Sequence, residues 1–171
     1  MAPDDVVAQL EQLHAAAFGW ALSCCRWDRA SAEDVLQASY LKILDGQARF
    51  AGRSCFRTWV FGVIRRTAQE ERRRAALARW LPFARLLVGP EAVDGRPDAE
   101  TALMRADETA RLVHALSRLP VRQRDVLHLV FYEDLTIAEA ATVLGVALGT
   151  ARAHYERGKS ALRRTLDGKD R

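Results

Sequence analysis

Several residue patterns that mark common protein classes are missing from this chain. Only three cysteines occur, Cys24, Cys25 and Cys55, and no CxxC pair or cysteine–histidine cluster has the spacing of a zinc site. We therefore expect reduced thiols, buried or partly buried, and no bound metal. The absence of a glycine-rich phosphate loop and of a nucleophile elbow argues against an enzyme and against a cofactor.

Long apolar runs are missing as well. No apolar stretch reaches the roughly 18 residues that a membrane-spanning helix needs. The N-terminal segment MAPDDVVAQL has two aspartates and no basic residue, unlike a signal peptide, so we expect a cytoplasmic protein with no membrane insertion. Positive charge, in contrast, is in excess, because 26 lysines and arginines stand against 22 aspartates and glutamates. This balance favours a polyanionic partner.

The fold class predicted from the apolar pattern is all-α, because apolar residues recur at helical spacing and no segment alternates as a strand does. Helices are expected over about 4–26 and 31–44, the second starting with a capping box of Ser31 and Asp34. The stretch 88–100 contains two prolines, two glycines and an acidic excess, which predict a linker. Two small helical domains, residues 1–87 and 101–171, would then flank it. The apolar stripe expected on the helix over 31–44 is Leu36, Tyr40, Ile43 and Leu44.

A helix-turn-helix is predicted near the C-terminus. Thr136 and Glu139 form a capping box ahead of a small apolar face, and Gly145 stands where a helix C-cap needs positive φ. A short turn then leads to a helix over about 148–166, and a second helix of this kind enters the major groove of DNA. His114 and His128, upstream of this motif, have no carboxylate or cysteine at ligand spacing, so we interpret them as core or surface histidines.

The faces of this last helix differ in character. Ala151, Tyr155, Gly158 and Leu162 share the inner stripe, whereas Arg152, Glu156, Lys159 and Arg163 lie on the opposite side. A plain solvated helix would pair Glu156 with Arg152 and Lys159, each pair contributing only a few tenths of a kcal/mol. The preceding turn favours a DNA-reading helix instead, with Arg163 and Arg164 suited to phosphate contacts.

The N-terminal half places aromatic residues among arginines. The aromatic residues of this segment are Phe50, Phe56, Trp59 and Phe61, and the arginines among and after them include Arg49, Arg53, Arg57, Arg65 and Arg66. Proteins that bind single-stranded nucleic acid stack bases on aromatic rings beside such cations. A helical core is the other interpretation, and we favour it for Trp59 and Phe61. For Phe50 both interpretations stay open.

Three segments in order carry a family resemblance: SAEDVLQASYLKIL, RFAGRSCFRTWVFGVIRR, and the run from LPVRQRDVLHL through GTARAHYERGKSAL. Together they resemble the extracytoplasmic-function (ECF) sigma factors of bacterial RNA polymerase. The resemblance implies a sigma2 domain that binds the β′ clamp helices of core RNA polymerase and melts the −10 element of promoter DNA. It also implies a sigma4 domain that reads the −35 duplex and docks on the β flap.

The resemblance further implies roles for individual residues. For the polymerase clamp they are Asp34, Leu36 and Gln37. For the −10 strand they are Phe50, Gly52, Arg53, Ser54 and Phe56 of the loop that captures a flipped base, with Arg65, Arg66 and Gln69 on the helix that follows. For the −35 element they are Thr150, Arg152, Ala153, Glu156, Arg157, Lys159, Arg163 and Arg164.

The sequence departs from the family pattern at three positions. Ala38 stands where an acidic clamp residue is usual, and His154 where a basic residue is usual. Ala147 replaces a polar residue that would cap the last helix, a loss of about 1 kcal/mol unless Thr150 caps it instead.

Other functions remain open on the sequence alone. A free-standing helix-turn-helix regulator would bind duplex DNA without polymerase, but it leaves the aromatic–arginine segment unexplained. A helical adaptor that binds only protein would show little salt-dependent DNA affinity. An anti-sigma factor that holds such a protein inactive is a further candidate partner.

Overall fold

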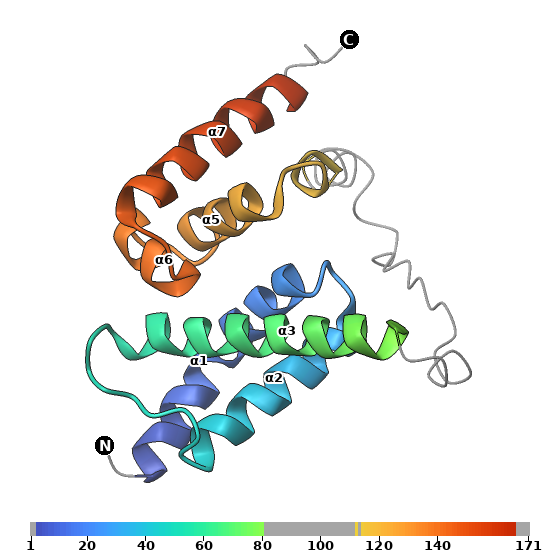
Figure 1. Ribbon diagram of the computed structural model, residues 1–171. Coiled ribbons are helices and arrows are strands. Elements are labelled where there is room, and N and C mark those ends of the chain that lie inside the picture. The colour runs from blue at the N-terminus through green and yellow to red at the C-terminus, as the bar shows by residue number, and fades with distance from the viewer. Residues whose placement is uncertain (1–2, 81–111, 113, 167–171) are drawn as a thin grey trace, which may run out of the picture. The chain divides into compact units, whose positions relative to one another are not determined.

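The computed structural model describes residues 3–80, 112 and 114–166, and within these ranges the elements are helices joined by turns (Figure 1). The described residues include no β-strand, so the all-α prediction is confirmed. The chain separates into two compact units, Met1–Gly95 and Arg96–Arg171. The predicted linker over 88–100 lies outside the described residues, as do the predicted ends of the two domains beside it.

The first unit is built from three helices that pack on one another: α1 (Pro3–Cys24), α2 (Arg29–Leu44) and α3 (Phe56–Trp80). Trp20 and Phe61 are fully buried at its centre, and the Trp20 indole Nε1 donates a hydrogen bond to the Phe61 carbonyl oxygen at 3.0 Å. Burying one large apolar side chain contributes roughly 1.5–3 kcal/mol. The core prediction for Phe61 is confirmed, whereas Trp59 is only partly buried.

The start of α2 differs from the prediction. The N-cap is Asp28, whose backbone is extended (φ −76°, ψ 110°), and Ser31 is already the third helical residue. The Ser31 hydroxyl donates to the Asp28 carboxylate instead of capping with Asp34. The predicted Ser31–Asp34 capping box is therefore wrong, because the helix begins directly after Asp28, three positions upstream of Ser31.

The apolar stripe expected on α2 is only partly confirmed. Leu36 and Ile43 are buried, but 52% of Leu44 is exposed and Tyr40 is half-buried. On another side of the helix, Lys42 binds Glu70 and Thr67 of α3. The hydrogen bond from Lys42 lowers the pKa of the Glu70 carboxyl. This ion pair joins α2 to α3.

The three cysteines are free thiols in different surroundings. Cys24 is buried and Cys25 partly so, as expected, but Cys55 is exposed. Burial raises the pKa of the Cys25 thiol to about 11, which keeps it protonated at neutral pH. The Cys55 sulfur lies 3.0 Å from the Thr58 hydroxyl at the start of α3.

The second unit contains α5 (Val121–Phe131), α6 (Ile137–Leu144) and α7 (Leu148–Leu166), and a further helical stretch over 114–117. Leu116, Leu119 and Leu127 form a buried cluster against which Tyr155 and Leu162 of α7 pack. The capping box of Thr136 and Glu139 is present, with the Glu139 amide donating to Thr136 Oγ1 at 3.2 Å. Gly145 ends α6 with φ 60° and ψ 41°, the left-handed conformation predicted for it.

A buried histidine–glutamate pair lies at the C-terminal end of α5. His128 Nε2 lies 3.3 Å from Glu133 Oε1, both side chains are buried, and the Tyr132 ring stacks on the imidazole at 5.3 Å. His128 is therefore a core histidine, one of the two interpretations given to it, and its buried partner is Glu133. The contact arises because the chain turns back after the helix, which brings a residue five positions along to the imidazole.

Gly158 allows α7 to approach α5 closely. A Cβ there would lie 3.0 Å from Leu127 Cδ1, 3.1 Å from Gln123 Cβ and 3.3 Å from the Gln123 carbonyl oxygen. Overpacking of this kind costs about 1–3 kcal/mol, and the gain in helix propensity from glycine to alanine is about 1 kcal/mol. Gly158→Ala should therefore lower the melting temperature of the second unit, as measured by circular dichroism.

Gly149 is the matched control, because it lies on the same helix and a Cβ there meets no atom within 4 Å. Gly149→Ala should leave the melting temperature unchanged or raise it. If Gly158→Ala melts at or above the Gly149→Ala variant, α5 and α7 do not need this close approach.

Candidate nucleic-acid interface

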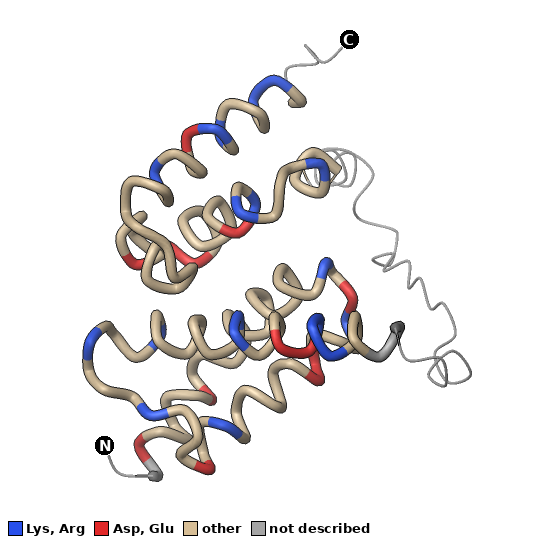
Figure 2. Tube along the Cα trace, viewed as in Figure 1, with Lys and Arg blue, Asp and Glu red and all other residues tan. Residues whose placement is uncertain are grey.

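The α7 helix presents a basic face opposite its packed face. Ala151 and Gly158 are buried and Tyr155 and Leu162 are half-buried, which confirms the predicted inner stripe. The exposed members of the predicted −35 set are Thr150, Arg152, Glu156, Arg157, Arg163 and Arg164, whereas Ala153 and Lys159 are half-buried. Figure 2 shows basic positions along α7, interrupted by the acidic Glu156.

The predicted surface ion pairs of Glu156 do not form. No Arg152–Glu156 or Glu156–Lys159 contact occurs on α7, all of whose residues the structure describes. The Lys159 ammonium lies instead over the Tyr155 ring, 5.6 Å from its centre. Glu156 therefore does not hold the Arg152 side chain. The interpretation of α7 as a solvated helix stabilised by these two ion pairs is not supported.

Thr150 does not cap α7. The helix begins at Leu148, and the Ala151 amide donates to the Ala147 carbonyl oxygen at 3.0 Å. Thr150 is therefore the third helical residue, and the predicted replacement cap is wrong. The N-terminus of α7 starts from an alanine, which offers no side-chain acceptor to the first-turn amides.

Three aromatic rings meet where the loop before α3 joins the first turn of that helix. Phe50, Phe56 and Trp59 have ring centres 5.3–5.5 Å apart, with Phe50 edge-on to Phe56, and each ring is partly exposed. Edge-to-face pairs of this kind contribute about 0.5–1.5 kcal/mol beyond their buried area. The ring contacts thus hold Phe50 in place, as expected of a packing residue. Part of its ring stays exposed, as stacking on a base would require.

The polar residues around this aromatic cluster are mostly accessible. Gly52 and Arg53 are exposed, and Ser54 is partly exposed with its hydroxyl donating to the Cys55 carbonyl oxygen at 3.2 Å. The Arg57 guanidinium lies over the Phe61 ring at 5.4 Å. An anionic strand that reaches the aromatic cluster would therefore meet cationic and hydroxyl groups beside it.

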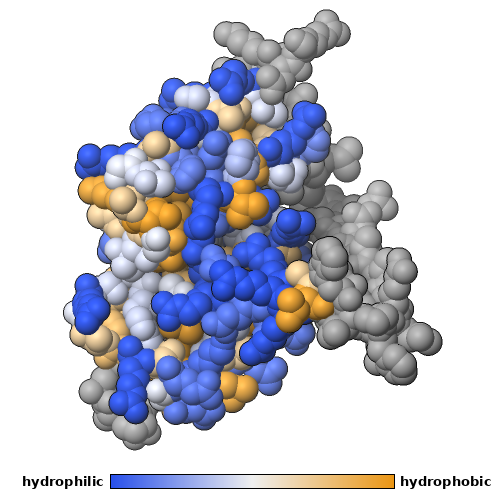
Figure 3. All heavy atoms as spheres, in the orientation of Figure 1, coloured by the Kyte–Doolittle hydropathy of each residue, from blue (hydrophilic) through white to orange (hydrophobic). Residues whose placement is uncertain are grey.

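The residues predicted on α3 divide into surface and interior. Arg66 is exposed and Gln69 half-buried, but only 8% of Arg65 is exposed. With the Gln69 amide oxygen turned toward it, the Arg65 guanidinium donates two hydrogen bonds at 2.9 and 3.1 Å. Arg65 is therefore part of the packing of α3, and we withdraw it from the strand-facing set. Figure 3 shows hydrophilic side chains over α3, where Arg66, Arg72, Arg73 and Arg74 are exposed.

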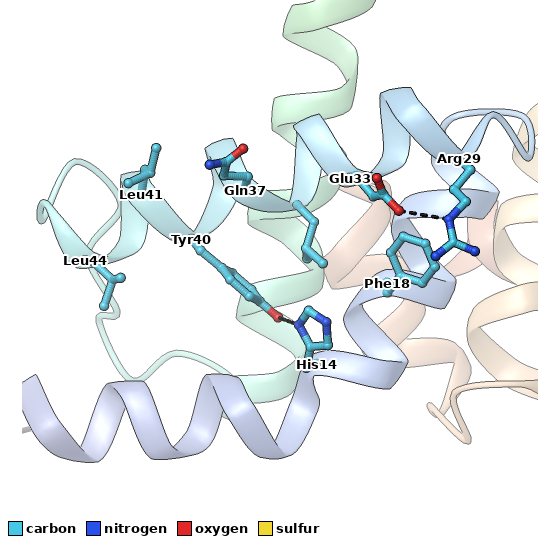
Figure 4. A pocket seen from close by; sticks show the side chains of 9 residues that line it. His14, Phe18, Arg29, Glu33, Gln37, Tyr40, Leu41 and Leu44 are labelled. Atoms are coloured by element: carbon cyan, nitrogen blue, oxygen red, sulfur yellow. Dashed lines mark hydrogen bonds and ion pairs between the residues drawn. The ribbon is translucent and has the colours of Figure 1, made fainter.

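An open groove of about 450 Å³ lies between α1 and α2 (Figure 4). Tyr40 and His14 meet in it, with the Tyr40 hydroxyl 3.5 Å from His14 Nδ1, and burial raises the pKa of Tyr40. At one end the Arg29 guanidinium lies 5.7 Å from the centre of the Phe18 ring. The full lining is His14, Phe18, Arg29, Glu33, Leu36, Gln37, Tyr40, Leu41 and Leu44.

The predicted clamp residues lie on or beside this groove. Asp34 and Gln37 are exposed, but Leu36 is 5% exposed and belongs to the packing under the groove. Sequence reasoning missed Leu41 and placed Leu44 in the packed stripe, but both line the groove and are 53% and 52% exposed. Their positions four and seven residues after Gln37 were the available signal, because that spacing puts them on the Gln37 face of α2.

Among the described residues no group of three or more histidine, cysteine, aspartate or glutamate side chains could hold a metal ion. No described helix is both long enough and apolar enough to cross a membrane.

Comparison with known proteins decides the family. The family model described as Sigma-70 region 2 matches residues 10–77, and the model of Sigma-70 region 4 matches residues 109–162. The ECF RNA polymerase sigma factor SigL of Mycobacterium tuberculosis is 31% identical over 147 residues, covering 81% of this chain and 76% of SigL. The chain belongs to the ECF sigma factors.

A further relative and a solved structure are also similar to this chain. The RNA polymerase sigma-H factor of Pseudomonas aeruginosa is 27% identical over 144 residues, covering 81% of this chain and 75% of that protein. The sigma factor RpoE from Bartonella quintana, solved in complex with the anti-sigma factor NepR, shares the fold with a TM-score of 0.73 at 24% identity, covering 98% and 99% of the two chains.

As an ECF sigma factor, the protein acts in promoter-specific initiation of transcription by RNA polymerase. The alternative of a free-standing helix-turn-helix regulator is not favoured, because both sigma regions match in the order of the family.

Proposed function

We propose that this ECF sigma factor divides promoter recognition between its two units. The α2 surface binds the β′ clamp helices of core RNA polymerase, and the cluster of Phe50, Phe56 and Trp59 captures the melted −10 strand. The α7 helix reads the −35 duplex, while the second unit also docks on the β flap. The protein carries no catalytic step of its own and works in the cytoplasm, where the polymerase makes the RNA.

The surface of α2 carries this proposal. Asp34 and Gln37 supply exposed polar groups, and Leu41 and Leu44 supply exposed apolar surface on the same helix. An interface needs both, because apolar anchors contribute affinity while polar groups fix orientation. The open groove beside these residues gives room for side chains of a partner helix.

Capture of the melted strand depends on the aromatic cluster of the first unit. A base leaves the DNA stack at a cost of a few kcal/mol, which the capturing site must offset. The partly exposed Phe50 ring can stack on such a base, and the exposed Arg53 beside it suits the strand backbone.

An anti-sigma factor is a further partner that we propose. The solved structures of similar fold include RpoE bound to NepR and CnrH bound to the cytosolic domain of CnrY. A partner of this kind would compete with polymerase if it covered the exposed leucines of α2.

The double variant Asp34→Ala/Gln37→Ala tests the polymerase contact. It should bind core RNA polymerase about tenfold more weakly, because both polar contacts of the interface are truncated. Binding is measured by titrating labelled sigma factor with core enzyme, and circular dichroism checks the helical fold.

The control variant Asp5→Ala/Gln47→Ala changes the same residue types at exposed positions of the first unit outside α2. It should bind core polymerase like the wild type. Unchanged polymerase affinity in the α2 double variant would contradict the assignment of α2 as the clamp surface.

A further inference from the structure

A second groove, of about 420 Å³, lies between the first turn of α5 and the C-terminal half of α7. Its lining residues are Gln123 of α5 and Glu156, Arg157, Ser160, Ala161 and Arg164 of α7. Arg157, Ser160 and Arg164 are exposed, and Gln123 is half-buried. The groove therefore offers two guanidinium groups, one hydroxyl and one amide against a single carboxylate, and keeps an excess of positive charge.

The groove continues the DNA-reading face of α7. Arg157, Ser160 and Arg164 follow one another at spacings of three and four residues, so they form one stripe along the helix. Glu156, Arg157 and Arg164 belong both to this lining and to the positions proposed to face the −35 duplex. A ligand in the groove would thus lie next to DNA that is bound in register.

Gln123 reaches this groove because Gly158 permits close helix packing. The space for a Cβ on Gly158 is already filled by Leu127 Cδ1, Gln123 Cβ and the Gln123 carbonyl oxygen at 3.0–3.3 Å. The backbone of α5 at Gln123 is therefore held against α7. Donors from two different helices converge on one groove through this contact.

We propose that this groove binds one backbone phosphate of the −35 duplex, with Gln123 and Ser160 as donors beside Arg157 and Arg164. The inference rests on the proposed function of α7. A helix in the major groove has a sugar–phosphate strand on each side, and phosphate contacts fix its register without reading sequence. Gln123 and Ser160 are thus positioning residues that set how α7 lies in the groove of DNA.

The test uses holoenzyme assembled from core RNA polymerase and the full chain. Each phosphate of the −35 element is replaced in turn by an uncharged methylphosphonate, and promoter binding is measured for wild type and for Gln123→Ala/Ser160→Ala. On unmodified DNA the double variant should bind roughly tenfold more weakly, because two donors to a charged phosphate are lost. At one phosphate, the modification should weaken the wild type roughly tenfold and the double variant by less than about threefold.

Three comparisons keep the result interpretable. Ser117→Ala changes an exposed serine of the same unit outside the groove and should match the wild type at every phosphate. Gln123→Glu keeps the side-chain size but adds a negative charge, so it should weaken DNA binding more than Gln123→Ala does. Core polymerase affinity should be the same in all variants.

Identical phosphate profiles for wild type and the double variant would overturn the inference while leaving the proposed function intact. A loss of core polymerase affinity with unchanged DNA binding would also overturn it, because the groove would then be a protein contact. If wild-type holoenzyme showed no −35 preference at all, the proposed role of α7 would itself fail.

Discussion

Phe50→Ala should slow the formation of the open promoter complex by roughly tenfold to a hundredfold on a fully duplex promoter. Base–aromatic stacking contributes about 1–3 kcal/mol per base, and a change of 1.4 kcal/mol is about tenfold in rate. The loss falls on the step in which the −10 strand leaves the duplex. On a template with a pre-melted bubble, where that step has been bypassed, the same variant should be much less impaired. Open-complex formation is followed by permanganate reactivity of unpaired thymines.

The aromatic cluster supplies its own controls. Phe50 contacts both Phe56 and Trp59, so its removal also costs packing within the first unit. Phe50→Tyr keeps an aromatic face and should retain most of the rate, whereas Phe50→Leu keeps apolar volume without the face and should behave like alanine on duplex DNA. Equal losses on duplex and bubble templates, or full activity of the leucine variant, would show that Phe50 only packs.

Features that depend on residues within one turn could be predicted from the sequence. Thr136, Glu139 and Gly145 mark the two ends of α6 through hydrogen bonds and a backbone conformation that involve only near neighbours. The start of α2 could not be fixed in this way, because Asp28 and Ser31 are both good N-caps three residues apart. Local propensity allowed α2 to begin after either residue, and in the structure it begins after Asp28.

Contacts between distant segments lay beyond the local patterns. An arginine among other arginines predicts an exposed cation, yet Arg65 is buried and meets Gln69. Leu44 continued an apparently buried stripe, but the packing of α1 against α2 leaves it exposed beside the groove. Both errors have one cause: periodicity places residues on a helix face, and tertiary packing decides which faces are covered.

If α7 reads the −35 duplex as proposed, the charges of its individual residues should separate by role. Arg152 lies early in α7 and is exposed, and an arginine that contacts guanine with two hydrogen bonds contributes about 1–3 kcal/mol of discrimination. Arg152→Ala should therefore relax the base preference at one −35 position by roughly tenfold to a hundredfold. Arg164→Ala should instead weaken all promoters alike and reduce the slope of log affinity against log salt concentration by about one. A promoter-library selection with holoenzyme measures the sequence profiles, and a salt titration measures the slopes.

Substitution of Glu156 distinguishes base reading from a surface role more clearly than the arginine variants do, because a carboxylate facing DNA repels phosphate. It is exposed and has no ion pair with Arg152 or Lys159, so its charge is not neutralised within α7. A base-reading role would have the carboxylate accept a hydrogen bond from cytosine N4, and Glu156→Gln should then change which base is preferred at that position. A surface residue without this role would leave the preference alone, and its neutralisation would raise affinity for every sequence slightly by removing the repulsion. Identical selection profiles for wild type, Arg152→Ala and Glu156→Gln would mean that α7 contacts DNA without reading its bases.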